Sequence, residues 1–244
     1  MSNSWPKWLF IVLLTIAALI VVPIYGFYWY GTSALPRDLL PSPQRFPPEL
    51  RTLYWRSLGG GPHVEIGELN PVTFTWELAV DIVRAPHAGH LRNKAARQAL
   101  NPLARLRTSK AIHDLGRMRR HAAEIAYLIR TSREWSDAEI LDTVLAEAWY
   151  GRNAHGIDAA SEAYFGVPAM QLGTEESLAL FALLKGPSYY DPACHRERFT
   201  ERYRHLASMA GMDDSADSAN HALSRLIGTT CAKPAVIPAK VRVQ

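Results

Sequence analysis

The longest apolar stretch of the chain runs from Trp8 to Tyr30 and contains no charged residue. As an α-helix rising about 1.5 Å per residue it would extend roughly 34 Å, enough to cross a hydrocarbon core of about 30 Å. The pattern therefore predicts a transmembrane helix over residues 8–30, preceded by a short tail, residues 1–7. Aromatic residues at both ends are typical of anchors at the membrane interface: Trp8, Tyr25, Tyr28, Trp29 and Tyr30.

A cleaved signal peptide is the alternative interpretation of this segment. The apolar region of a signal peptide is about 7–15 residues long and leads into small residues at the cleavage site. The run in this chain is longer and leads into bulky aromatics, which favours the anchor. Its flanking cations, Lys7 on one side and Arg37 and Arg45 on the other, do not fix its orientation.

After the apolar run the pattern becomes proline-rich and then helical. Prolines recur through residues 31–49, which predicts a semi-rigid stalk. Residues 111–129 carry apolar side chains three and four positions apart, and Ser136 with Glu139 forms a capping-box signature for the following helix. No segment has a strand pattern strong enough to build a sheet, so we expect a mainly α domain over residues 50–228 and an irregular tail over 229–244. Further helices are expected at 76–84, 93–106, 157–164, 175–184, 197–209 and 216–226.

The charge of the chain is unevenly distributed. Its formal net charge is +4, but the segment from Arg92 to Arg133 holds eleven lysines and arginines against two acidic residues. Such a block indicates a phosphate-bearing or anionic-lipid partner, with a solvated basic helix face as the alternative. Nucleic acid is not expected as a partner, because no aromatic interleaving or known motif accompanies the basic residues.

General motifs of catalysis are missing from the sequence. It has no phosphate-binding Walker loop, no dinucleotide glycine fingerprint and no zinc-like spacing of cysteine and histidine. The two cysteines, Cys194 and Cys231, could pair in an oxidising compartment or remain buried thiols, and the sequence leaves both open.

The most specific signal is a series of motifs between Ser136 and Pro192. In order they are Ser-x-x-Glu-Ile-Leu, Tyr-Gly-Arg, Gly-Ile, Tyr-Phe-Gly and Tyr-Asp-Pro. In composition and spacing they resemble glycosyltransferase family 51, the peptidoglycan transglycosylase module of penicillin-binding proteins and of their monofunctional relatives. The matching positions include Ser136, Glu139, Tyr150, Gly151, Arg152, Gly156, Ile157, Tyr164, Phe165, Gly166, Leu172, Pro187, Tyr190, Asp191 and Pro192.

The resemblance implies a lysozyme-like helical fold and a substrate, lipid II, which is an undecaprenyl-diphosphate-linked disaccharide pentapeptide. It places the domain on the periplasmic side of the bacterial inner membrane, with a single-pass anchor and residues 1–7 in the cytoplasm. Other cell-wall synthesis proteins are further partners that it suggests. No ligand set in this sequence calls for a metal, and we expect no cofactor, while the resemblance leaves a divalent metal as the alternative because many family members use one.

Polymerisation of lipid II needs a carboxylate as general base and a cationic site for the departing diphosphate. The family carries Arg-Lys-x-x-Glu on a helix, and the aligned residues here are Arg120, His121 and Glu124. Since Arg120 and Glu124 lie four positions apart, they share one helix face. The resemblance assigns Glu124 a catalytic role and gives Arg120, His121 and the nearby Arg117 a role in substrate binding. From the matching motifs it also assigns Gly151, Arg152 and Gly156 to substrate binding.

The first catalytic motif of the family, Glu-Asp-x-x-Phe-x-x-His-x-Gly, does not occur. Direct alignment places Leu58 and Gly59 at the Glu-Asp positions, and the nearest acidic residues, Glu65 and Glu68, lack the expected spacing. The next motif, Gly-Gly-Ser-Thr-Ile-Thr-Gln-Gln, is reduced to Gln98 and the leucine two positions after it.

Three hypotheses remain for the function. The first is a divergent peptidoglycan glycosyltransferase that uses Glu65 or Glu68 together with Glu124. The second is a catalytically inactive relative that binds lipid-linked glycan or a cell-wall synthesis partner through the same cleft. The third is a membrane protein that binds anionic lipid through its basic segment.

Overall fold

The structure is a computed structural model that describes residues 7–84, 94–111, 116–212, 215–228 and 231. It confirms the prediction of a mainly helical domain. The helices are α1 (Lys7–Thr32), α2 (Pro48–Ser57), α3 (Pro71–Arg84), α4 (Lys94–Ala111), α5 (Arg117–Glu134), α6 (Asp137–Glu147), α7 (Ile157–Phe165), α8 (Thr174–Leu183), α9 (Pro187–Tyr190), α10 (Arg196–Ala210) and α11 (Ser215–Ser224). A 3₁₀ turn, η1 (Ala169–Gln171), and two short strands, β1 (Trp149–Gly151) and β2 (Ala154–His155), complete the described elements.

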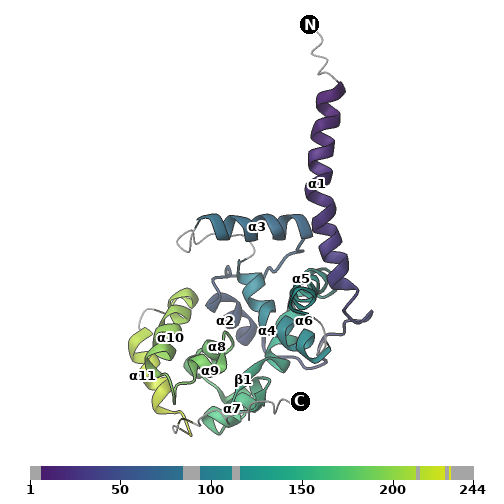
Figure 1. The fold of residues 1–244 in the computed structure, drawn as a ribbon. Helices are drawn as coiled ribbons and strands as arrows, with labels where there is room; N and C mark the ends of the chain where they lie inside the picture. Colours follow the sequence, from purple (N-terminus) through teal and green to yellow (C-terminus); the bar gives the residue numbers. More distant parts are fainter. Residues whose placement is uncertain (1–6, 85–93, 112–115, 213–214, 229–230, 232–244) are drawn as a thin grey trace, which may run out of the picture.

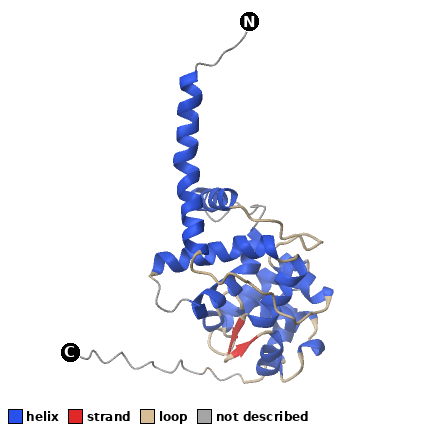
Figure 2. Ribbon diagram, turned by 90° about the vertical axis from the view of Figure 1, so that its right-hand side faces the viewer, coloured by secondary structure: helices blue, strands red, loops and turns tan. Residues whose placement is uncertain are grey.

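Helix α1 projects from a rounded helical domain (Figures 1 and 2). Its length and composition are sufficient to cross a membrane, and its apolar side chains are exposed along most of its length. Only its last turns contact the domain, where Gly31 packs against Ala122 of α5. Helix α3 also contacts α1 and runs across its direction (Figures 1 and 2).

The core of the domain forms around α8. Every residue of α8 from Glu176 to Leu183 is buried, as expected of a helix that is apolar on most of its faces and surrounded by other helices. Helices α2, α7, α10 and α11 contact it. The ring of Phe181 packs against that of Tyr54 in α2, with centroids 5.0 Å apart. Two further helices, α4 and α5, pack against each other on the α1 side of the domain.

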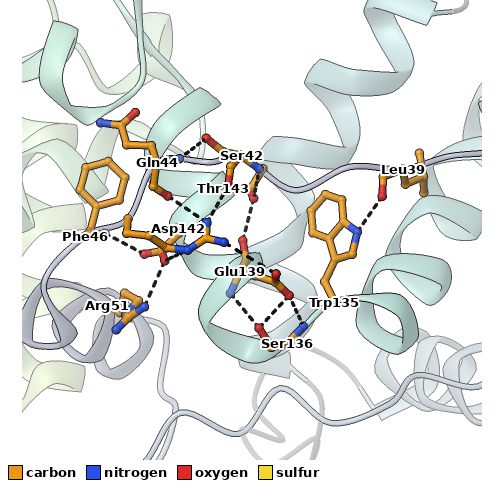
Figure 3. A network of polar contacts seen from close by, with 11 residues as sticks. Leu39, Ser42, Gln44, Phe46, Arg51, Trp135, Ser136, Glu139, Asp142 and Thr143 are labelled. Carbon is orange, nitrogen blue, oxygen red and sulfur yellow. Dashed lines mark hydrogen bonds and ion pairs between the residues drawn. The ribbon is translucent and has the colours of Figure 1, made fainter.

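The segment between α1 and α2, expected as a proline-rich stalk, lies along α6 (Figure 3). The amide of Ser42 donates to the hydroxyl of Thr143 at 2.9 Å, and the amide of Phe46 donates to the buried carboxylate of Asp142 at 3.2 Å. The indole of Trp135 donates to the carbonyl of Leu39 at 3.0 Å. These bonds connect the segment that follows α1 to the domain core.

Three details differ from the sequence-based expectations. Helix α4, expected over 93–106, continues to Ala111 with Pro102 inside it. The helix expected over 111–129 begins at Arg117 and continues to Glu134, while residues 112–115 lie outside the described part. The β1–β2 hairpin was not expected, because strands of two and three residues are too short to show an alternating pattern. Its turn places Arg152 and Asn153 at positive φ, as two-residue hairpin turns require.

Cys194 and Cys231 form a disulfide, so of the two possibilities left open by the sequence the structure has the paired one. The bond joins the segment after α9 to the segment after α11, which are 37 positions apart.

Candidate functional site

The residues aligned with the Arg-Lys-x-x-Glu motif lie at the start of α5. Glu124 is partly buried, and its carboxylate lies 3.4 Å from Nδ1 of His121. Arg117 and Arg120 are exposed. Between them, the guanidinium of Arg119 stacks over the ring of Tyr30 at 5.5 Å. The start of α5, with its cations, therefore lies beside the end of α1.

The two glutamates proposed as replacements for the missing general base lie elsewhere. Glu65 and Glu68 are exposed in the loop before α3, while their neighbours Ile66 and Leu69 are buried. The amide of Leu69 donates to the hydroxyl of Ser132 at 3.0 Å. Because Ser132 lies eight residues beyond Glu124, that contact is about 12 Å further along α5. The described contacts do not bring either glutamate to Glu124.

Arg152 performs a structural task. Its guanidinium donates to the carbonyl of Ile227 at 2.7 Å and to that of Ala163 at 3.3 Å, and it stacks over the ring of Tyr164 at 4.2 Å. It also lies 3.7 Å from the carboxylate of Asp191. These contacts tie the hairpin to α7 and to the segment after α11, and the two bonds to carbonyls use one of the two terminal guanidinium nitrogens.

The two glycines assigned by resemblance, Gly151 and Gly156, shape the same hairpin. Both have positive φ, a conformation that glycine adopts at little cost. A Cβ at Gly156 would lie 2.3 Å from the carbonyl oxygen of Ala146, and one at Gly151 would lie 2.9 Å from Pro187. Positive φ and the lack of space for a Cβ explain why both positions are glycine.

Gln98, the remaining predicted site residue, lines a cavity of about 330 Å³ between α2, α4, α8 and α10. Three cationic side chains contribute to the same wall, Arg105 from α4, Lys185 after α8 and Arg202 from α10. None of the described lining residues is acidic. The lining consists of Tyr54, Leu58, Gln98, Asn101, Pro102, Arg105, Phe181, Leu184, Lys185 and Arg202.

The electrostatics of this cavity favour an anion. Burial lowers the pKa of Arg202, which reflects the cost of holding its charge away from water, although nearby Tyr190 and Tyr54 oppose that shift. Its Nε is buried and has no hydrogen-bond partner. Desolvation also lowers the pKa of His205, on the same helix, and the positive charges of Arg202, Lys185 and Lys94 lower it further. A buried, unpartnered donor in a positive field is suited to bind a phosphate oxygen.

Sequence reasoning had singled out Gln98 but missed Arg105, Lys185 and Arg202. Arg105 belonged to the basic segment and Lys185 to the stretch with the family motifs, yet no spacing rule connects them. They meet only because α4, α8 and α10 converge in the fold.

Metal binding has no visible basis in the described part of the chain. No group of three or more histidine, cysteine, aspartate or glutamate side chains there is arranged to hold a metal ion.

A second and larger cavity, of about 540 Å³, borders the start of α2 and of α8. Its lining is mainly apolar and includes Phe46, Leu50, Leu53, Met170 and Leu172.

Comparison with known proteins identifies the family of the domain. Residues 103–210 match the family model described as Transglycosylase. Penicillin-binding protein 1A of Mycolicibacterium smegmatis is 39% identical over 89 residues, which is 36% of this chain and 11% of that protein. Penicillin-binding protein 1A of Mycobacterium tuberculosis is 40% identical over 87 residues, again 36% of this chain and 11% of the relative. Penicillin-binding protein 2D of Bacillus subtilis is 38% identical over 86 residues, 35% of this chain and 12% of the relative.

The chain thus spans only about a ninth of the length of these relatives. The family match begins at residue 103, beyond Leu58, Gly59 and Gln98, where the first two motifs of the family are missing or reduced. Residues 103–210 therefore match the transglycosylase family model, and this part of the chain is similar to penicillin-binding proteins over fewer than 90 residues in the three relatives named.

Proposed function

We propose that this protein is anchored in the bacterial cytoplasmic membrane by α1 and binds the diphosphate of lipid II without polymerising it. The observation that carries the proposal is the cavity between α2, α4, α8 and α10, whose wall has three cations and, among the described lining residues, no carboxylate. The proposal corresponds to the second hypothesis from the sequence.

Binding is supported by the chemistry of Arg105, Lys185 and Arg202. A diphosphate carries several negative charges and many acceptor oxygens, and guanidinium groups bind such oxygens through two parallel donors. The unpartnered Nε of Arg202 offers one buried donor that gains a partner when an anion enters. Gln98 and Asn101 add neutral side-chain donors to the same wall.

Lack of polymerisation is supported by the side chain at the position of the family's first glutamate. Leu58 is aligned with that glutamate and lines the cavity, so the wall is apolar where a general base is required. Glu65 and Glu68, which could have replaced it, are exposed and bonded to no described partner near Glu124.

Placement outside the cytoplasm is supported by the Cys194–Cys231 disulfide, because such bonds persist in oxidising compartments. Together with α1, it supports the proposal that the cavity lies on the side of the membrane where lipid-linked glycan is assembled into the wall.

Substitution of Lys185 tests the binding site. Lys185→Gln removes one cavity cation from an exposed side chain and should leave the fold intact. Losing a charge-assisted contact of about 1.5–3 kcal/mol would weaken binding of lipid II, or of undecaprenyl diphosphate, by roughly tenfold or more. The measurement is a titration of the full chain in nanodiscs with fluorescent lipid II.

Arg204→Gln is the matched control, because Arg204 is exposed on α10 two positions after Arg202 and does not line the cavity. We expect its affinity to equal that of the unmodified chain. Equal affinity for Lys185→Gln, Arg202→Gln and Arg204→Gln would rule out the cavity as the diphosphate site.

A further inference from the structure

The segment that links α1 to α2 is bound to the domain along its backbone, and we call its residues 36–46 the strap. The guanidinium of Arg130 in α5 donates to the carbonyls of Pro36 at 2.9 Å and of Arg37 at 2.8 Å. The strap contains three prolines, which offer a carbonyl acceptor but no amide donor. A segment of this composition suits binding by side chains that donate, and it leaves few amides that need a partner of their own.

The middle of the strap is held at the end of α5 and by α4. The buried indole of Trp135 donates to the carbonyl of Leu39 at 3.0 Å, and the guanidinium of Arg107 in α4 lies 3.4 Å from the carbonyl of Leu40. The Nε of Arg107 also donates to the carboxylate of Glu147 in α6 at 2.7 Å. Arg107 therefore joins the strap, α4 and α6 at one point.

The far end of the strap is held by α6 together with α2. The amide of Ser42 donates to the hydroxyl of Thr143 at 2.9 Å, and the amide of Phe46 donates to the carboxylate of Asp142 at 3.2 Å (Figure 3). The same carboxylate accepts from Arg51 of α2 at 3.1 Å. Because Asp142 is fully buried, the end of the strap and α2 share one fixed acceptor.

Two of the four helices around the cation-lined cavity are thus connected to the strap, α4 through Arg107 and α2 through Asp142. The other two walls come from α8 and its following residues and from α10. The position of the strap therefore bears on the spacing between one pair of walls and the other. The strap-connected walls carry Tyr54 and Leu58 of α2 and Gln98, Asn101, Pro102 and Arg105 of α4.

We infer that the docked strap holds α2 and α4 at the spacing the cavity needs for a diphosphate, so that strap docking and anion binding favour each other. The inference rests on the proposed function. The two states are a strap docked on Thr143 and Asp142 and a strap released from them. No strap residue is among the described residues that line the cavity, so the effect acts through the position of the walls. Linkage requires that a bound anion stabilise the docked strap by the factor by which docking raises the anion's affinity.

Thr143→Val releases the strap without touching the cavity, because valine keeps the shape of threonine and removes the acceptor of the Ser42 amide. Thr131→Val is the matched control. Both threonines are fully buried and donate to the carbonyl four residues earlier in their helix, but the described bonds of Thr131 stay within α5.

The first measurement is calorimetric titration of the full chain in nanodiscs with inorganic diphosphate. We expect Thr143→Val to weaken binding by about threefold to fivefold, the effect of losing one hydrogen bond, and Thr131→Val to leave it unchanged.

Arg130→Gln releases the other end of the strap and serves as an independent second variant. It removes the bonds to the carbonyls of Pro36 and Arg37 and also the ion pair with Glu134. Glu134→Gln removes that ion pair alone and is its control. We expect Arg130→Gln to weaken diphosphate binding and Glu134→Gln to leave it unchanged.

The second measurement separates coupling from a purely structural role. Hydrogen–deuterium exchange of the unmodified chain is followed by mass spectrometry with and without saturating inorganic diphosphate. We expect the anion to slow exchange in the peptide that contains Ser42 and Phe46 by about threefold to fivefold, as reciprocity requires. Exchange of the Gly156 amide, bonded to the carbonyl of Ala148 at 2.9 Å in the β1–β2 hairpin, should not change.

Two results would overturn the inference, and they differ in what else they remove. Diphosphate binding with unchanged exchange in the strap would show that the strap only stabilises the fold, and it would leave the proposed anion site intact. No binding of diphosphate or of lipid II to the unmodified chain would remove the proposed function together with the coupling.

Discussion

At the scale of single residues, Asp142 connects α6 to α2 and to the segment between α1 and α2. Its side chain is fully buried and accepts hydrogen bonds from the amide of Phe46 at 3.2 Å and from Arg51 at 3.1 Å, and Arg45 lies 3.8 Å away (Figure 3). A buried carboxylate is tolerated because these donors replace the water it has lost.

Asp142→Ala leaves Arg51 and the amide of Phe46 without their acceptor. We expect it to lower the free energy of unfolding by about 3–5 kcal/mol, as found when one partner of a buried ion pair is removed. Glu134→Ala is the control, because Glu134 pairs with Arg130 at the surface and its loss should cost less than about 1 kcal/mol. Denaturant titration in detergent micelles measures both, and similar values for the two variants would contradict this role of Asp142.

His205 reports on the charge of the cavity at the same scale. Its pKa lies below the ordinary value of 6.5 because desolvation and the cations Arg202, Lys185 and Lys94 disfavour protonation. The folded state therefore holds this proton less tightly than the unfolded chain, and the protein loses stability as the pH falls from about 6.5. An anion bound beside these cations would offset their field.

We expect inorganic diphosphate to raise the pKa of His205, and Lys185→Gln to raise it in the absence of diphosphate. The readout is the histidine ring signal in an NMR pH titration, with His205→Gln used to identify the resonance. A pKa that neither change moves would show that the cavity cations do not act on this residue.

At the scale of elements, the contact between α1 and α5 determines how α1 meets the domain. Gly31 allows this contact, because an added Cβ would lie 2.1 Å from the carbonyl oxygen of Ala122. The stacking of Arg119 on Tyr30 lies in the same interface.

Gly31→Ala should separate the two helices and lower the free energy of unfolding by about 1–3 kcal/mol, a typical cost of overpacking. Gly26→Ala is a matched control on α1, since nothing lies within 4 Å of its added Cβ. Thermal unfolding in nanodiscs compares the two variants. Equal melting temperatures would show that the stability of the protein does not depend on the close approach of α1 and α5.

Elements with strong local signals were predicted well from the sequence. Ser136 and Glu139 form the expected capping box, in which Ser136 donates its amide to the Glu139 carboxylate at 2.9 Å and its hydroxyl accepts from the Glu139 amide at 3.3 Å. The amide and the hydroxyl of Ser136 both donate to the Glu139 carboxylate, and these two bonds lower the pKa of Glu139 more than the charge of Arg45 does. The apolar run likewise predicted α1, which extends three residues beyond the predicted ends in total.

The candidate site was predicted less well, because its residues come together only through tertiary packing. The sequence placed it at Glu124 and at the Tyr-Gly-Arg motif, where the family resemblance is strongest. In the structure Arg152, Gly151 and Gly156 shape the β1–β2 hairpin, while the cavity cations come from α4, from the residues after α8 and from α10. Local periodicity carries no information about such a convergence.

At the scale of the whole molecule, three features combine. Residues 103–210 match the transglycosylase family model, and α1 is long and apolar enough to cross a membrane. The cavity provides a cationic wall with Leu58 at the position of the first glutamate. In this account the scaffold retains the ability to bind a lipid-linked diphosphate and has lost the general base.

Binding without polymerisation is tested most directly by incubating the full chain in nanodiscs with fluorescent lipid II. Lipid II binding and glycan product are followed in parallel. A transglycosylase of known activity serves as the positive control. We predict saturable binding that Lys185→Gln weakens, and no glycan product at any protein concentration. Formation of glycan strands that Glu124→Gln abolishes would contradict the account and show that the protein is an active glycosyltransferase.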